Sequence, residues 1–472
     1  MKKIAILLPL LLTFTLLQGC HSSSTTNQST VRLVNDNGVA NSLGVIPKLD
    51  MYWSASGAVS AVVSTIDYGT ASSSVSSGSG VSTIQLATAG NTASGGSAFS
   101  FGGGTSYTML AYPTYTPGPS GEVYSLQVLQ LIDNQTAPTS GNALMGIVDR
   151  SGAGSLDVYV AAGTSIPSGT WVSGISGTIR YTTLPLTTTT GTTAYHIQVT
   201  GAGAGYGNDV RLDIPSVAIG NQQILTLVLT PTTGGALVDG LVFFQQGQTL
   251  LTPQKSVTSY KNGSVRVRIA ANNGTTITAL TTNANGTTPL LASDLSNANV
   301  SSYMVVPLNG SITLPTPQAP GIAAPSLPLS LTVNGAVVAT SASVPANAVP
   351  GADLTLLAYG TSSYTLLNDD NTLASSGYAK LRLVNAISGG NPISLTYGGV
   401  GVANAQNIVV GAQPTATNLL LPGGSAYTIG VTGTGVSYTP GSPTLVSQGV
   451  YTLFMLSNTV GVVNPDHSFQ GP

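Results

Sequence analysis

The sequence predicts an all-β protein made of tandem β-sandwich modules, and three observations support this fold class. Gly, Ser, Thr, Asn and Pro separate short β-branched and apolar runs, which is the mixture that strands and tight turns require. Such runs recur at intervals of about ten residues, with no convincing helical pattern between them. One strand-turn-strand pattern also appears four times along the 472 residues.

The repeated pattern joins two strands through a short turn. Its last copy runs from Lys380 to Asn385 and continues beyond a Gly-rich turn with the strand Ile393–Tyr397. Aligning the first strands of the copies gives spacings of 114, 122 and 114 residues between Val34, Val148, Ala270 and Val384. A second landmark, a Thr in the second position of a strand near the end of each copy, recurs at Thr108, Thr226, Thr355 and Thr452.

Two landmarks in the same order define four modules, each long enough to fold as a domain. We place module 1 at 31–138, module 2 at 142–252, module 3 at 264–375 and module 4 at 377–472. Long stretches rich in Gly, Ser or Pro predict surface loops at 72–82, 95–106 and 309–328. Such loops are where rigid scaffolds carry recognition.

The N-terminus has the pattern of an export signal. Lys2 and Lys3 precede an apolar run from Ile4 to Leu17. This run is shorter than the roughly 20 residues of a membrane span, so we predict a signal peptide over residues 1–19.

The segment Leu17-Gln18-Gly19-Cys20 resembles the lipobox of bacterial lipoproteins, although Gln18 departs from the usual small or aliphatic residue. The resemblance implies that Cys20 becomes an acylated N-terminus, and that His21 in the next position favours the outer membrane. Residues 20–30 would then be a lipidated, flexible tether. The alternative is a plain secretory signal with a chance cysteine.

Charged residues make up only 6% of the chain, with a net charge of −2. Binding to nucleic acid requires a basic surface, so we expect no nucleic-acid partner. The single cysteine, Cys20, excludes an intrachain disulfide and a cysteine-based metal site.

The pattern Arg-x-Val/Leu-x-Asn, then Leu-Asp-Val-Tyr-Val, then Asp67-Tyr68-Gly69-Thr70, resembles the bacterial domain-of-unknown-function family 4397. The likeness is best at 31–160 and 378–456. The chain has Asn35-Asp36-Asn37-Gly38 where that family commonly has His-Ala-Ser-Pro. The resemblance implies exported transthyretin-like or immunoglobulin-like sandwiches in tandem, and it implies no activity.

No catalytic constellation accompanies the repeats. Hydrolysis by a nucleophile needs Ser, His and usually a carboxylate together. His21 is in the tether and His467 in the C-terminal tail, while His196 lies on a predicted strand, facing solvent or a hydroxyl. Glu122 is the single glutamate, which disfavours paired-carboxylate glycosidase chemistry. We predict a non-enzymatic protein, with a hydrolase dependent on His196 or Glu122 as the minor alternative.

We expect no metal and no other cofactor. The Asp/Asn clusters at 35–37, 133–134 and 368–371 are interpreted as turn caps, with calcium binding as the alternative. The stretch Gly201–Gly207 lacks the register of a phosphate-binding loop and is interpreted as a flexible loop.

Several aromatic residues offer a platform for stacking on the apolar face of a sugar. The candidates are Tyr52, Trp53, Tyr112, Tyr115 and Trp171. Their alternative is packing in the core or across strands.

We therefore predict a lipid-anchored envelope or surface protein whose serial modules present loops for adhesion to a glycan or protein ligand. The alternative is a structural or assembly component of the envelope that pairs with other envelope proteins through strand edges. An outer-membrane barrel is disfavoured, because barrels carry aromatic girdles and only 6% of these residues are aromatic.

Overall fold

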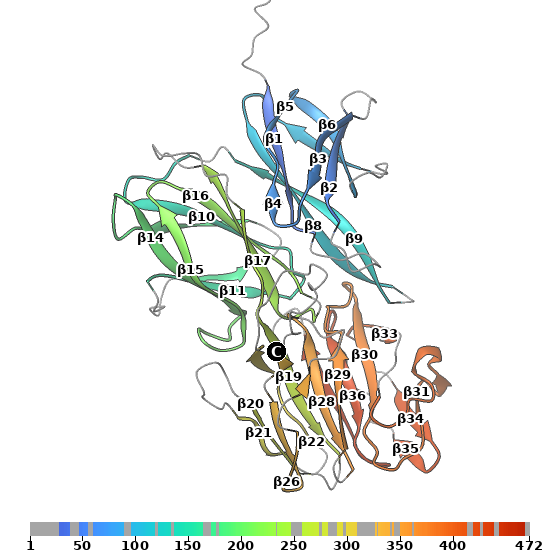
Figure 1. Ribbon diagram of the computed structural model, residues 1–472. Coiled ribbons are helices and arrows are strands. Elements are labelled where there is room, and N and C mark those ends of the chain that lie inside the picture. The colour runs from blue at the N-terminus through green and yellow to red at the C-terminus, as the bar shows by residue number, and fades with distance from the viewer. Residues whose placement is uncertain are drawn as a thin grey trace, which may run out of the picture. The chain divides into compact units, whose positions relative to one another are not determined.

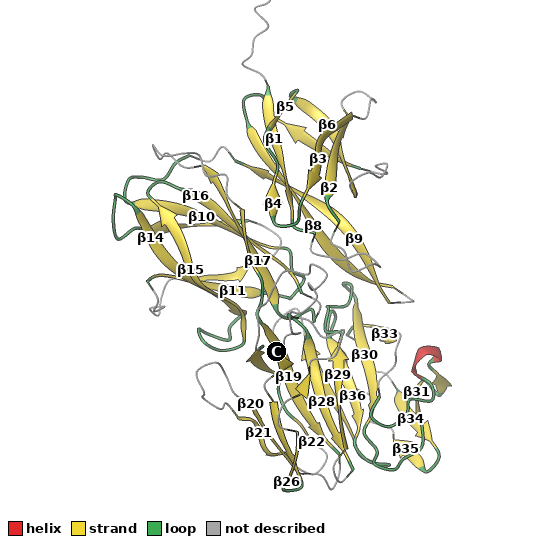
Figure 2. Ribbon diagram, viewed as in Figure 1, coloured by secondary structure: helices red, strands yellow, loops and turns green. Residues whose placement is uncertain are grey.

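The computed structural model describes residues 28–37, 47–54, 60–88, 96–118, 121–133, 136–163, 171–175, 179–232, 234–246, 257–272, 276–281, 290–295, 299–308, 326–327, 329–339, 342–343, 350–360, 363–412, 419–424, 428–438 and 443–467. Strands dominate this part of the chain (Figure 1), and Figure 2 shows a short 3-10 helix, η2 (Ala403–Ala405). None of the helices described here has the length and hydropathy of a membrane span.

The chain divides into two compact units. The N-terminal unit is drawn from Met1–Asn35, Lys48–Ala111 and Val128–Gln135, and the C-terminal unit from Asp36–Pro47, Tyr112–Gln127 and Thr136–Pro472. The C-terminal unit therefore holds modules 2, 3 and 4 together.

Each module contains the same pair of sheets, which confirms the all-β fold of tandem sandwiches (Figure 2). In the first sheet of every module, the first strand pairs in parallel with a strand near the end of that module. The register is the same in all four, because this pairing joins Arg32 to Thr108, Gly146 to Thr226, Arg268 to Thr355 and Arg382 to Thr452. The two landmarks of the sequence thus lie on paired strands, where each Thr is the partner of the residue two positions before the first landmark.

Module 1 has the following sheets. The first is ordered β4 (Thr70–Ala71), β1 (Ser29–Asn35), β8 (Ser106–Gly118), β9 (Gly121–Ile132), and β5 (Val75–Ser77) also pairs with β1. The second is ordered β3 (Ser60–Ile66), β2 (Leu49–Ser54), β6 (Gly80–Thr88), β7 (Ser97–Phe101).

Module 2 extends one strand further than predicted. Its first sheet is ordered β13 (Arg180–Pro185), β10 (Asn142–Asp149), β16 (Ile224–Pro231), β17 (Val238–Gln246), β18 (Val257–Tyr260), so β18 lies beyond the expected end at 252. Its second sheet is ordered β12 (Trp171–Ile175), β11 (Leu156–Ala162), β14 (Thr192–Gly201), β15 (Val210–Gly220).

Module 3 repeats the plan and adds a small two-stranded sheet, β24 (Ser326–Leu327) with β27 (Ala342–Ser343). Its first sheet is ordered β22 (Asn299–Val300), β19 (Ser264–Ala271), β28 (Asp353–Tyr359), β29 (Ser363–Asp369), and β23 (Met304–Pro307) also pairs with β19. Its second sheet is ordered β21 (Leu290–Leu295), β20 (Ile277–Thr281), β25 (Leu329–Val333), β26 (Ala336–Ala339).

Module 4 consists of two four-stranded sheets. The first is ordered β33 (Leu419–Pro422), β30 (Tyr378–Asn385), β36 (Val450–Met455), β37 (Gly461–His467). The second is ordered β32 (Val400–Gly401), β31 (Ile393–Tyr397), β34 (Ile429–Gly433), β35 (Val436–Tyr438).

Alternation along the first strands decides which side chains fill each core. In β19, Val267 and Ile269 point into the core of module 3, and in β30, Leu381 and Leu383 point into that of module 4. The intervening residues face outward, and strands usually place polar side chains there for solvent.

In modules 3 and 4 these outward faces pack against each other instead. A separate apolar cluster joins the two modules and consists of Ala270, Leu357, Leu367, Val384, Ala386, Phe454 and Leu456. Modules 3 and 4 are therefore side by side in the C-terminal unit (Figure 1), which corrects the expected serial arrangement for this pair.

Candidate functional site

Where the first strand of a module pairs with the strand that carries the landmark Thr, side chains of Arg, Thr and Asp form a hydrogen-bonded triad. In module 1 the Nε of Arg32 donates to the Oγ1 of Thr108 at 2.7 Å, and that hydroxyl donates to Asp133 at 2.8 Å. The same arrangement recurs in module 3 with Arg268, Thr355 and Asp369, and in module 4 with Arg382, Thr452 and Asp466. A hydroxyl can accept a hydrogen bond from a guanidinium and donate one to a carboxylate, so the Thr side chain satisfies both charged neighbours at once.

Module 2 lacks both charges of the triad. Gly146 occupies the Arg position, and the ring of Tyr181 covers it, since a Cβ on that glycine would lie 2.9 Å from the ring. In modules 3 and 4 the triad Asp lies two residues after the register partner of the triad Thr. In module 2 the register partner of Thr226 is Phe243, so Gln245 occupies the Asp position. Arg and Asp are thus lost together in this module, and the Oγ1 of Thr226 is buried without a hydrogen-bond partner.

The triads of modules 3 and 4 form ion pairs with each other across the face that the two modules share. Arg268 hydrogen-bonds to Asp466 of module 4, and the NH1 of Arg382 lies 3.7 Å from Asp369 of module 3. All four side chains are 6% exposed or less. The contact is reciprocal, because each module offers its Arg to the Asp of the other.

Aromatic rings enclose the Arg268 guanidinium. Its Cζ lies 4.6 Å from the ring centre of Tyr303 and 4.7 Å from that of Phe454. The Tyr303 hydroxyl donates to Asp369 at 2.6 Å and accepts from the Nδ2 of Asn371 at 2.9 Å. Cation–π contact and these hydrogen bonds offset part of the desolvation of the buried charges.

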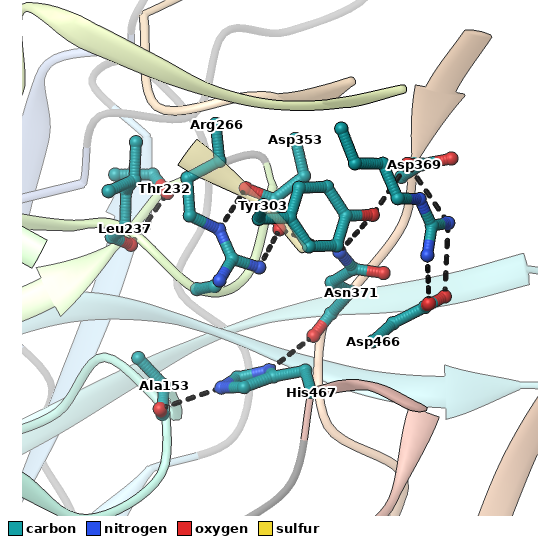
Figure 3. A network of polar contacts seen from close by, with 12 residues as sticks. Ala153, Thr232, Leu237, Arg266, Tyr303, Asp353, Asp369, Asn371, Asp466 and His467 are labelled. Carbon is teal, nitrogen blue, oxygen red and sulfur yellow. Dashed lines mark hydrogen bonds and ion pairs between the residues drawn. The ribbon is translucent and has the colours of Figure 1, made fainter. Parts of the chain in front are cut away.

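A second bidentate pair extends the network (Figure 3). The Nε and NH2 of Arg266 donate to the two oxygens of Asp353 at 2.8 and 2.6 Å. The Asn371 amide donates to Asp353 at 2.7 Å, and its Oδ1 accepts from Arg382 at 2.9 Å. Asn371 therefore links the two sets of charges.

Electrostatics favour the ionised forms of Asp466, Arg268 and Arg382. Burial would raise the pKa of Asp466, but Arg268 and Arg382 outweigh burial and hold that pKa below its ordinary value. Burial would likewise lower the pKa of both guanidinium groups, and the facing carboxylates of Asp369 and Asp466 raise it instead.

His467 was expected in a C-terminal tail, but it belongs to a strand and connects the network to module 2. It ends β37, with Nδ1 2.7 Å from the Asn371 carbonyl oxygen and Nε2 2.9 Å from that of Ala153 (Figure 3). Burial, together with Arg211 and Arg266, lowers the pKa of its imidazole to about 3. The ring is neutral near pH 7, so one of its nitrogens carries a proton and donates to its carbonyl, while the other nitrogen faces the second carbonyl without a proton.

Modules 2 and 3 meet at two glycines with no room for a side chain. A Cβ on Gly234 would lie 2.5 Å from the Asp353 nitrogen, and one on Gly235 would lie 2.3 Å from the Thr372 nitrogen. Thr232 donates to the Gly351 carbonyl at 3.0 Å across the same junction. The three modules of the C-terminal unit are thus joined by backbone contacts as well as by charges.

The predicted turn cluster at 368–371 is mostly part of this network. Asp369 pairs with arginines and Asn371 bridges them, while Asp370 binds Lys380 at 2.9 Å and also caps the nitrogen of Thr372. Turn chemistry therefore explains one residue of the cluster. Arg and Lys side chains already pair with the carboxylates of this cluster, so few carboxylate oxygens are left to coordinate calcium. Among the described residues, no group of three His, Cys, Asp or Glu side chains forms a metal site.

The structure places the other candidates as follows. His196 lies on the outward face of β14 and is partly exposed, as expected, but its partner is the Asp213 carboxylate at 2.7 Å and not a hydroxyl. Trp53 is 8% exposed and stacks on Phe101 at 4.8 Å, which places it in the core of module 1. Tyr52 and Tyr112 are half-buried on β2 and β8. Outside the described part lie Leu17, Gln18, Gly19 and Cys20 and the side chains of Tyr115, Glu122 and Trp171.

Comparison with known proteins gives no family. No family model matches the chain, and no curated protein matches it. Among solved structures, the Bacillus anthracis TIE protein aligns with 86% of this chain and 68% of its own at 8% identity and a TM-score of 0.14. The pilus adhesin SpaC from Lactobacillus rhamnosus GG aligns with 73% of this chain at 12% identity and a TM-score of 0.14, and this chain spans 44% of that adhesin. TM-scores this low establish no shared function.

Proposed function

We propose that this chain is a non-enzymatic, lipid-anchored envelope protein whose sandwich modules present loops for adhesion or ligand binding. One observation supports the proposal above others: most buried charged residues of the C-terminal unit pair with one another, either within one module or between modules 3 and 4. In the described part of this unit, ion pairs involve Arg211, Lys261, Arg266, Arg268, Lys380 and Arg382. Catalysis needs titratable groups that reach a substrate, and buried, mutually paired charges do not reach one.

A compact unit of three modules suits presentation. Binding loops function best on a scaffold that does not reorganise, because ordering on contact subtracts from affinity. The anchor remains a prediction from the Leu17–Cys20 segment and the resemblance that it carries.

The anchor is tested by Cys20→Ser in the full chain. We expect the wild type in the membrane fraction with a labelled acyl chain, and the variant released without label. Protease treatment of whole cells then separates surface exposure from a periplasmic location. A wild type that is soluble and unlabelled would reject the anchored function.

Edge strands favour the alternative of envelope assembly. Val337 on β26 is 63% exposed and Val400 on β32 is 70% exposed, and both strands are sheet edges with one paired neighbour in the described residues. Exposed apolar edges can pair with a strand of another chain. A photo-crosslinker at position 337 or 400 that captures envelope proteins, rather than external ligands, would support assembly over adhesion.

A further inference from the structure

One hairpin of module 2 is longer than its counterparts in modules 3 and 4. In module 3, β25 and β26 are joined by two residues, Asn334-Gly335, and in module 4, β34 and β35 are joined by Thr434-Gly435. The corresponding β14–β15 hairpin of module 2 contains the segment 201–209 between its last pair of strand partners. A two-residue turn closes the same hairpin elsewhere in this protein, so the fold does not require the longer segment.

Hydrogen bonds tie the segment to the underlying sheet, a feature that its interpretation as a flexible loop did not include. The Gly203 nitrogen donates to Asp157 and the Gly207 nitrogen to Gln198, each at 2.8 Å. Gly203, Gly205 and Gly207 all have positive φ, which glycine adopts at the lowest energy. Asp157 is 4% exposed and also accepts from the Gly174 nitrogen at 2.9 Å, so one buried carboxylate fixes two segments.

This framework presents one large side chain, that of Tyr206. Its ring packs edge-on against Tyr159 with ring centres 5.9 Å apart, yet the residue is 43% exposed. An aromatic ring left in solvent adds little to folding stability. A loop built to hold such a ring therefore indicates recognition, which is what loops on rigid scaffolds carry.

Polar side chains continue the surface beside the ring. Register places Tyr159, Gln198 and Asp213 on neighbouring strands in one row. Asp213 has a side chain 48% exposed and lies 2.7 Å from His196. Adjacent strands are about 4.8 Å apart, so the row spans roughly 10 Å, the length of one to two sugar rings. Trp171, a candidate from the sequence, is the register partner of Tyr159 on β12, the strand that flanks β11 on the side away from β14.

We propose that the 201–209 segment and this row form a carbohydrate-binding site, with Tyr206 packing on the apolar face of a pyranose and Asp213 and His196 bonding its hydroxyls. A sugar ring has C–H groups on its faces and hydroxyls at its rim. The site offers an aromatic ring for the C–H face and polar side chains for the hydroxyls. A protein partner would need about 800 Å² with an apolar centre, whereas one exposed ring among Gly and Ala residues provides far less. This inference rests on the proposed function, because it assigns a class of ligand to the loops that the proposed function describes as binding one.

The test uses the mature full chain and a panel of hexaoses of β-1,4-glucose, β-1,4-N-acetylglucosamine, α-1,4-glucose and β-1,4-xylose, together with insoluble peptidoglycan. Calorimetry and pull-down should find at least one glycan bound. Tyr206→Ala and a variant with 201–209 replaced by Asn-Gly should weaken binding about tenfold or more. Tyr397→Ala, which removes a 38% exposed tyrosine of module 4, is the matched control and should bind as the wild type does.

Two outcomes would overturn the site. One is a wild type that binds none of these glycans, and the other is a Tyr206→Ala variant that is folded and binds as tightly as the control. Neither result affects the anchored function, which membrane fractionation of Cys20→Ser decides separately.

Discussion

The guanidinium of Arg268 in module 3 bonds the carboxylate of Asp466 in module 4, 198 residues further along the chain. Both side chains are fully buried. Each also belongs to the Arg-Thr-Asp triad of its own module. A motif that braces the strands within one sandwich therefore also joins two sandwiches, provided that their outward faces meet.

Removing one partner of this pair is predicted to destabilise the C-terminal unit strongly. Asp466→Asn keeps the shape of the side chain but leaves Arg268 and Arg382 with one carboxylate between them. A buried charge without compensation typically costs about 3–5 kcal/mol, so we expect an effect of that size in chemical denaturation. Asp213→Asn, in the same unit but 48% exposed, should change the free energy of unfolding by less than about 1 kcal/mol.

Replacing the whole charge set by apolar residues should be far less harmful than replacing one member. We expect a variant with Met at 268 and 382 and Leu at 369 and 466, with both triad threonines changed to Val, to recover most of the loss. Apolar replacement of complete buried ion networks is often neutral or stabilising. A variant as unstable as Asp466→Asn would show that the charges themselves are indispensable.

The hydroxyl of the triad is predicted to matter only where charges flank it. Thr355→Val removes a group that bonds both Arg268 and Asp369, and should cost about 1–3 kcal/mol. Thr226→Val changes the equivalent residue of module 2, whose buried hydroxyl has no partner, and should be neutral or stabilising. Urea denaturation of the two variants compares them directly, and equal effects would contradict the assignment of the triad.

His467 should make the C-terminal unit sensitive to acid. Its pKa is lowered to about 3 in the folded protein by burial and by Arg211 and Arg266, against about 6.5 when unfolded. The unfolded chain thus binds the proton more tightly, so stability is complete above about pH 6.5 and is lost as the pH falls toward 3. At pH 5 the loss is about 2 kcal/mol.

The comparison with His467→Asn isolates this effect. Burial raises the pKa of Asp149 to about 6, which acts in the opposite direction in both proteins. The difference in unfolding free energy between wild type and variant should therefore shrink between pH 7.5 and pH 5. A difference that is the same at both pH values would show that His467 does not titrate as described.

The junction between modules 2 and 3 is predicted to tolerate no methyl group at Gly235. Gly235→Ala places a Cβ 2.3 Å from the Thr372 backbone at a φ of +86°, so we expect a loss of about 3 kcal/mol or more. Gly377→Ala has nearly the same φ, +87°, with open space around the Cβ, and should cost about 1 kcal/mol. Thermal unfolding of both variants separates steric overlap from backbone strain.

Local sequence features predicted the sandwiches because alternation reports which residues face a module's own core. The spacing of Val34, Val148, Ala270 and Val384 and of the four threonines predicted a fourfold repeat, and the structure adds that the two landmarks lie on paired strands in each module. The pairing of modules 3 and 4 could not be predicted in this way, since an outward Arg in a strand normally faces solvent. One signal was available: arginine at the same register in three modules of a chain with 6% charged residues.

The carbonyl of Ala153 accepts from or faces the ring of His467, so the last strand of module 4 ends beside module 2. A spectroscopic label at the exposed position 465, near the end of β37, would thus report on the surroundings of module 2 as well as on those of module 4.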